Sequence, residues 1–243
     1  MINVWRIPLM LILSSCLVIS CSKLASNEGS KLTPKDNAEA ELIALCLSGN
    51  LVAPDSLYKQ VLSHLATIRS TFGNNYECLN RITFVPPWRV GRLIIGLDDT
   101  TAQKVANAEY QAWDELNKKY QVTKINTGLL EFIGSTVLYF KGRLHPCRLA
   151  ELYADLPGVR HAEPNGRIGD SPNIYPRQTG DGITYLFRDA WGDCPSGCIY
   201  SEYWYFVFEE KQPILIGHWA PHEDPQEPDW WNEAKENIEQ FRE

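Results

Sequence analysis

The sequence predicts an α+β fold, and three observations favour that class. Short apolar runs typical of buried strands alternate with segments in which apolar residues recur every three or four positions, as on one face of a helix. From Val90 to Asn165 these segments follow the order strand, helix, strand, strand, helix, strand. After residue 166, strand-like runs dominate until a closing helix. We therefore expect a ferredoxin-like β-α-β-β-α-β core over residues 90–165, with N-terminal helices before it and a C-terminal β-meander plus helix after it.

The first half of this core reads as a strand followed by a helix. Residues 92–97 form a short apolar run, which predicts a buried inner strand. The polar cluster at residues 98–101 is typical of a helix start. One apolar face then predicts a single helix over residues 100–120, and it consists of Val105, Ala108, Ala112 or Trp113, Leu116 and Tyr120.

The second half of the core reads as two strands, a helix and a last strand. Residues 122–132 and 136–140 are the strands, with Gly134-Ser135 as the turn between them. Pro146 suits the first turn of a helix, and Pro157-Gly158 ends it. Its apolar face is Leu149, Leu152, Tyr153 and Leu156. The last strand covers residues 159–163, and we expect both helices on the same face of the sheet.

The end of this segment carries a resemblance to a known family. Leu156-Pro157-Gly158-Val159 and Glu163-Pro164-Asn165 resemble the end of the propeptides of subtilisin-type proteases. Those propeptides share the β-α-β-β-α-β order, and related free-standing domains inhibit proteases. The resemblance implies that the edge near Glu163, Pro164 and Asn165 docks on such a protease. The chain differs in having a longer first helix and in continuing past Asn165, whereas a propeptide presents its C-terminal tail to the protease.

The N-terminus predicts export and lipid attachment. Residues 7–19 form an apolar run too short to span a membrane, which ends in Val18-Ile19-Ser20-Cys21. This pattern resembles a bacterial lipoprotein signal, and the resemblance implies that residues 1–20 are removed and that Cys21 carries fatty chains. Ser22 favours the outer membrane under the lipoprotein rule. Cys16 remains a second lipidation candidate, and an ordinary cleaved signal or an uncleaved anchor also remain open.

The segment before the core is predicted to contain a tether and helices. Residues 21–37 are expected to be a flexible tether. Residues 38–89 are expected to be a helical segment, with helices over 38–47 and from Asp55 or Ser56 to Phe72 and a short strand over 82–85. We expect these helices to pack on the open face or edge of the core sheet.

The C-terminal part, residues 166–243, is expected to extend the sheet or pack on it. A loop over residues 166–181 is long for a compact domain, so it reads as a linker or a functional loop. Strands follow at 183–188, 200–208 and 214–219, and an amphipathic helix at 230–241. The strand at 200–208 is apolar on both faces, which predicts that both are covered.

Composition and the cysteines narrow the function. The net charge of −7 argues against a nucleic-acid partner. In an exported chain, we expect disulfides Cys194–Cys198 and Cys46–Cys78, although pairing cannot be deduced from sequence. A zinc site at Cys194, Cys198, His218 and His222 is the alternative, because its Cys-x3-Cys and His-x3-His spacings suit tetrahedral coordination.

No nucleophile-and-base motif and no phosphate-binding glycine loop occurs in the sequence, so neither catalysis nor a cofactor is expected. The sequence predicts an exported, lipid-anchored binding or interaction module of the bacterial envelope, facing the periplasm or the surface. The alternatives are an inhibitor of subtilisin-like proteases and a metal-binding protein. Glu163, Pro164, Asn165 and Trp191 are the binding candidates. Trp191 lies in the charged segment 188–193, which reads either as part of a ligand site or as a hairpin turn.

Overall fold

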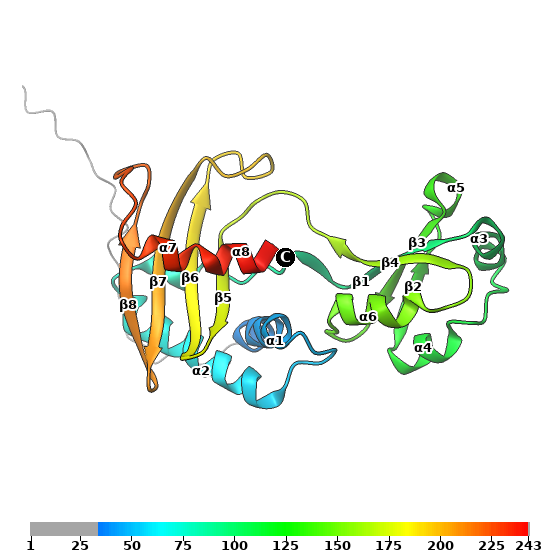
Figure 1. Ribbon diagram of the computed structural model, residues 1–243, viewed down its shortest axis with the longest axis horizontal. Helices are drawn as coiled ribbons and strands as arrows, with labels where there is room; N and C mark the ends of the chain where they lie inside the picture. The colour runs from blue at the N-terminus through cyan, green and yellow to red at the C-terminus, as the bar shows by residue number, and fades with distance from the viewer. Residues whose placement is uncertain (1–33, 243) are drawn as a thin grey trace, which may run out of the picture.

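The computed structural model describes residues 34–242, and it shows a mixed α+β protein with two antiparallel four-stranded sheets (Figure 1). One sheet has the strand order β2-β3-β1-β4, and the other has the order β5-β6-β7-β8. We call residues 88–166 the central lobe, and residues 34–87 with 167–242 the terminal lobe. The predictions for residues 1–33, including the signal, Cys16, Cys21 and most of the tether, lie outside the described residues.

The central lobe is built from the first sheet and the helices that pack on it. Its elements are β1 (Trp88–Leu97), α3 (Asp99–Ala106), α4 (Asp114–Lys119), β2 (Val122–Asn126), α5 (Leu130–Ile133), β3 (Ser135–Phe140), α6 (Pro146–Ala154) and β4 (Val159–Gly166). Leu93 and Leu138 of the sheet share one core with Val105 of α3 and Tyr153 of α6. The helical segments after β1 and after β3 therefore cover the same face of the sheet.

The single helix expected over residues 100–120 is wrong, because the chain breaks it into α3 and α4. Asn107 ends α3, and Ala108 has a left-handed backbone with φ 58°. Tyr110 and Trp113 then turn into the core, and the Tyr110 hydroxyl donates to the carbonyl of Pro157 over 2.6 Å. In a continuous helix Trp113 would share the face of Val105, but Tyr110 would lie off that face, so the break lets Tyr110 enter the core as well. The expected strand over 122–132 likewise ends at Asn126, before the short helix α5.

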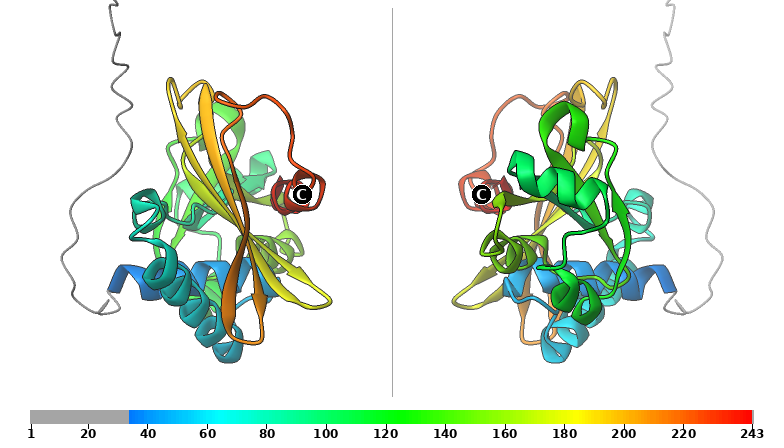
Figure 2. Two further views of the ribbon diagram at one scale, coloured as in Figure 1. Left: turned by 90° about the vertical axis from the view of Figure 1, so that its left-hand side faces the viewer. Right: turned by 90° about the vertical axis from the view of Figure 1, so that its right-hand side faces the viewer.

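The terminal lobe places its sheet between two helical layers (Figure 2). Its elements are α1 (Pro34–Ser48), α2 (Asp55–Phe72), the 3-10 helix η1 (Glu77–Asn80), β5 (Asn173–Thr179), β6 (Gly182–Trp191), β7 (Tyr200–Glu209), β8 (Gln212–Trp219), α7 (Trp231–Ala234) and α8 (Glu236–Arg242). Tyr185 and Trp204 face α1 and α2, whereas Leu186 and Tyr205 face α7 and α8. The prediction that both faces of the strand at 200–208 are covered is confirmed.

The prediction that the N-terminal helices pack on the sheet of the central lobe is wrong. Apolar side chains of α1 and α2, such as Ile43 and Val61, pack on the β5–β8 sheet rather than on the β1–β4 sheet. The reason is the alternation in β6 and β7, which gives the second sheet a second apolar face that needs cover. The two lobes also touch near the start of α6, where His145 N donates to Leu51 O over 3.0 Å and Arg148 Nε donates to Gly49 O over 2.7 Å.

Three further expectations about the terminal lobe differ from the structure. The loop expected over residues 166–181 contains the strand β5, so the meander has four strands and forms a sheet of its own. The expected strand over 82–85 is absent, because Val85 bonds to the side chain of Asn173 instead of to a neighbouring strand: Val85 N donates to Asn173 Oδ1 over 2.7 Å. The closing helix is divided into α7 and α8 around Lys235.

Candidate functional site

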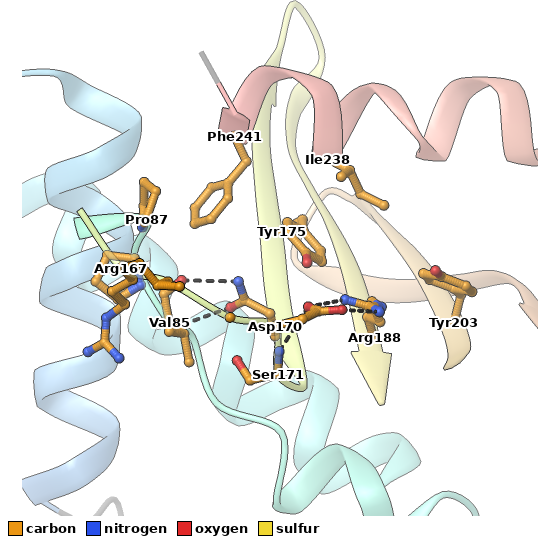
Figure 3. A pocket seen from close by; sticks show the side chains of 14 residues that line it. Val85, Pro87, Arg167, Asp170, Ser171, Tyr175, Arg188, Tyr203, Ile238 and Phe241 are labelled. Atoms are coloured by element: carbon orange, nitrogen blue, oxygen red, sulfur yellow. Dashed lines mark hydrogen bonds and ion pairs between the residues drawn. The ribbon is translucent and has the colours of Figure 1, made fainter. Parts of the chain in front are cut away.

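A cleft of about 580 Å³ opens on the terminal lobe, beside the point where the chain enters and leaves the central lobe (Figure 3). The segment 85–87 and the loop 167–171 line part of it. Tyr175 of β5, Arg188 of β6 and Tyr203 of β7 project from the sheet, and Phe241 reaches in from α8. Five separate stretches of sequence therefore meet at this place, because the loop and the start of β5 form one continuous stretch over 167–175.

The central polar feature of the cleft is an ion pair between Arg188 and Asp170. The two terminal nitrogens of Arg188 donate to the two carboxylate oxygens of Asp170 over 2.6 Å and 2.7 Å. This parallel, two-bond geometry is the strongest form of the arginine–carboxylate contact. Arg188 Nε donates to Ser201 Oγ over 2.9 Å, which fixes the third side of the guanidinium.

Asp170 also organises the loops that surround it. Its carboxylate accepts from the backbone of Ser171 over 2.8 Å and from the backbone of Cys198 over 3.2 Å. Its own N–H donates to the carbonyl of Cys194 over 2.9 Å. One side chain therefore joins the loop after β4, the strand β6 and the disulfide loop between β6 and β7.

The charges of this pair are stable at neutral pH. Hydrogen bonding from Arg188 is the main reason why the pKa of Asp170 lies below its ordinary value. Burial by itself would lower the pKa of Arg188, but the bond to Asp170 and the neighbouring Tyr175 and Tyr203 outweigh that effect and raise it. Burial raises the pKa of Tyr175, which therefore stays a neutral hydroxyl.

Aromatic and aliphatic groups form the rest of the wall. The rings of Tyr175 and Phe241 meet edge to face with 5.4 Å between their centres, and Ile238 lies beside them on α8. The polar atoms of the ion pair are already bonded to each other, so a ligand would gain mainly from the rings and from the hydroxyls of Tyr175, Tyr203 and Ser171. Among the described residues that line the cleft there is no histidine or cysteine, so they offer Ser171 no imidazole base.

The binding residues predicted from the sequence lie elsewhere. Glu163 and Pro164 lie on β4, an edge strand of the first sheet, where they pair with Ile94 and Leu93 of β1. Trp191 ends β6, is 39% exposed, and stacks on Tyr200 with 5.8 Å between ring centres. The structure therefore does not bring Trp191 together with the Glu163–Asn165 edge, and none of these residues lines the cleft.

Of the two predicted disulfides, one is present and one is wrong. Cys194 and Cys198 are bonded, and they close the loop that contacts Asp170. The predicted pair Cys46–Cys78 is not formed, because Cys46 carries a free thiol. Cys46 instead lines a second hollow of about 370 Å³, together with Cys147. Burial, and to a lesser degree the nearby Cys147, raises the pKa of Cys46 to about 12.

The zinc alternative is also wrong. The disulfide removes both of the thiolates that it requires. His218 stacks on Trp204 with 4.9 Å between ring centres, and His222 lies beside Trp191. Over residues 34–242, no three histidine, cysteine, aspartate or glutamate side chains are grouped as a metal ion would require.

The sequence interpretation missed Asp170, Tyr175 and Tyr203 as site residues. A signal for the site was present in Arg188, a charged residue at the end of an apolar strand, and in the loop over 166–181, which was named as a functional loop or a linker. The start of β5 determines which side chains of that loop face Arg188. No local sequence pattern specifies where β5 begins.

Comparison with known proteins identifies no similar protein. No family model matches the chain, and the searches of curated proteins and of solved structures find no match either. Within the described part of the chain, none of the helices has the length and apolar character needed to cross a membrane.

Proposed function

We propose that the protein is a non-enzymatic binding module of the bacterial envelope and that its ligand occupies the cleft around Arg188. The observation that carries this proposal is the preformed site: the bonds from Arg188 to Asp170 and Ser201 hold the polar centre in place before any ligand arrives. Pre-organisation of this kind lowers the entropy cost of binding. The aromatic wall then supplies contact area, as in most small-ligand sites.

The proposal also places the protein outside the cytoplasm. A signal over residues 1–20, a lipid on Cys21 and an outer-membrane address follow from the resemblance to lipoprotein signals. The Cys194–Cys198 bond supports export, because disulfides persist mainly in oxidising compartments. Replacing Cys21 with Ser is expected to move the protein from the membrane to the soluble fraction. Unchanged fractionation, with unchanged processing, would remove the lipid from the proposal.

Site-specific photocrosslinking tests the cleft. A photoreactive phenylalanine analogue at Tyr203, introduced in the producing cells, is expected to form an adduct with the ligand or partner. The same analogue at the exposed Gln178, on β5 outside the cleft, is the matched control. Ser171→Trp fills the cleft and is expected to abolish the adduct at Tyr203. An adduct that forms equally at both positions, or survives Ser171→Trp, contradicts the proposal.

We further propose that the central lobe is a ferredoxin-like domain of the propeptide type, and this makes protease inhibition the second candidate function. Its strand order β2-β3-β1-β4 and its helices on one face support that topology. The edge strand β4 carries Glu163 and Pro164, and an edge strand offers free backbone groups to a partner. The protein without residues 1–20 is expected to slow a subtilisin-type protease at micromolar concentration. Rapid digestion with no slowing of a peptide substrate would exclude this function.

A further inference from the structure

We infer a second site, an anion site for a phosphate group, at a hollow lined by Arg89, Arg92 and Arg167. The hollow has a volume of about 310 Å³, and Val90 and Ile168 are the other described residues that line it. It shares Arg167 and Ile168 with the rim of the cleft around Arg188. Figure 3 shows Arg167 at the far end of the cleft from Arg188, with its guanidinium directed away from it. The site is distinct from the cleft, and the inference does not depend on a ligand there.

Within residues 34–242, the three arginines have none of the carboxylate partners that usually neutralise such groups. None of the described residues that line the hollow is acidic. The ion pairs found among the described residues involve other arginines, such as Arg188 and Arg143, and none of these three. Arg92 instead lies over the ring of Tyr139, with 5.1 Å from its guanidinium carbon to the ring centre. In a chain with net charge −7, three uncompensated guanidiniums around one hollow form a local positive field.

A bulge in β1 brings the arginines to the same place. Trp88 pairs with Gly166 and Leu93 pairs with Pro164, so the four residues from Arg89 to Arg92 lie opposite Asn165 alone. In a regular strand, residues three apart point to opposite faces, whereas a bulge redirects the side chains. Arg167 follows Gly166 directly, so it comes back beside the bulge at the end of β4.

The bulge requires a special backbone conformation. Gly91 has φ +65°, and a Cβ atom at this position would lie 2.9 Å from the carbonyl oxygen of Phe140. Glycine adopts this left-handed conformation without the cost that other residues incur. Bulges are over-represented next to functional sites, where they redirect a side chain. The arginine hollow is therefore a built feature of the strand.

The number of guanidiniums indicates the ligand. One carboxylate accepts one arginine fork, so it would leave two of the three charges without a partner. A phosphate group carries more charge and more acceptor oxygens, and it accepts paired bonds from several guanidiniums at once. Ile168, which is 96% exposed, adds an apolar surface beside the charges. The phosphate can belong to a free phosphate compound or to a phospholipid headgroup, and the experiment below distinguishes the two.

Titration calorimetry of the full chain in chloride buffer, at constant ionic strength, tests the site. One arm uses inorganic pyrophosphate, and the other uses glycerophosphoglycerol, the water-soluble headgroup diester of an anionic phospholipid. Saturable binding of either probe supports the site, and the tighter of the two identifies the source. Absence of saturable binding in both arms overturns the inference.

Two matched variants show whether the hollow is responsible. Arg167→Gln is expected to weaken binding at least tenfold, while it keeps the backbone bond from Arg167 N to Pro87 O. Arg81→Gln removes another exposed arginine, one that lines none of the hollows described above, and it is expected to change affinity less than twofold. An equal loss in both variants would mean diffuse charge attraction and would overturn the inference. Unchanged thermal unfolding of Arg167→Gln confirms that the fold is intact.

Discussion

At the scale of single residues, the cleft depends on Asp170. The side chain of Arg188 is 11% exposed, so its charge needs a nearby counter-ion. Asp170→Ala removes that counter-ion and the two carboxylate bonds to the backbone of Ser171 and Cys198, and is expected to cost about 3–5 kcal/mol in the free energy of unfolding. Urea unfolding measures this loss. Asp181→Ala, at an exposed turn, is the control and should change the free energy by less than about 0.5 kcal/mol. Equal effects of the two changes would contradict this role.

The same pair predicts part of the acid sensitivity. The pKa of Asp170 is lower in the folded protein than its ordinary 3.8. The unfolded chain therefore takes up its proton first on acidification, and the stabilisation present above pH 3.8 is lost as the pH falls through the folded value. Unfolding midpoints between pH 5 and pH 2 should fall less steeply in Asp170→Asn than in the natural chain. An identical slope would contradict this assignment.

His64 predicts a second pH effect, in a milder range. It lies in α2 against the sheet, stacked on Phe208 with its Nδ1 3.2 Å from the hydroxyl of Tyr185. Burial lowers the pKa of His64 from 6.5 to about 4. The unfolded state binds this proton more readily, so stability present above pH 6.5 is lost as the pH falls towards 4.

Unfolding in urea at pH 7.0 and at pH 5.0 measures the His64 effect. The difference between the two pH values should shrink in His64→Gln, because glutamine does not titrate. His161→Gln replaces an exposed histidine and should leave the difference unchanged. If His64→Gln kept the full difference, the drop would have to come from other groups.

At the scale of elements, α1 and α2 are joined by the buried pair Glu39–Arg69. Arg69 Nη1 lies 2.7 Å from the Glu39 carboxylate, and the two side chains are 12% and 5% exposed. Glu39 also accepts from the backbone of Phe84 over 2.7 Å. Glu39→Ala is expected to destabilise the fold by about 3–5 kcal/mol. Glu41→Ala breaks an exposed pair with Arg143 and should cost at most about 1 kcal/mol. Urea unfolding of both variants checks the contrast.

The β1 bulge gives another prediction at this scale. Gly91→Ala places a Cβ in a left-handed conformation and should cost about 1–2 kcal/mol of stability. The change is also expected to weaken pyrophosphate binding at Arg89 and Arg92, if the hollow binds it. Gly180→Ala has open space around the new methyl group and serves as the control. Thermal unfolding and calorimetry measure both variants. If Gly91→Ala and Gly180→Ala had the same stability and the same affinity for pyrophosphate, this role of Gly91 would be refuted.

At the scale of the whole molecule, the chain enters and leaves the central lobe at one point. Trp88 pairs with Gly166, and Arg167 N donates to Pro87 O over 3.0 Å. The core residues of the two lobes fall into separate clusters. We infer that the central lobe is an insertion into the terminal lobe.

Replacing residues 88–166 with Gly-Ser tests the insertion. The shortened chain is expected to keep the near-ultraviolet circular dichroism of the buried Trp204 and to unfold cooperatively, because α1, α2 and the β5–β8 sheet supply its core. A chain that aggregates or lacks this signal would mean that the terminal lobe depends on the central lobe.

Local patterns predicted much of this fold. The helix from Asp55 to Phe72 and the helix beginning at Pro146 lie where apolar spacing and the polar or proline residues at their starts indicated, because those signals act within one turn. The Cys194–Cys198 bond could be predicted for the same reason, since the two cysteines are four positions apart. The break at Ala108 was missed because the burial of Tyr110 and its bond to the distant Pro157 override a helical pattern. The lipid on Cys21 stays a prediction.

The sequence by itself determined the α+β class, the strand apolar on both faces and the helices that cover sheets, because these depend on side-chain periodicity within single elements. Only the tertiary structure decided which sheet α1 and α2 cover, that Asp170 reaches Arg188, and that a bulge gathers Arg89, Arg92 and Arg167 around one hollow. Those pairings join residues far apart in the chain. Their energy depends on which surfaces meet after every element has formed, and no window of local sequence carries that information.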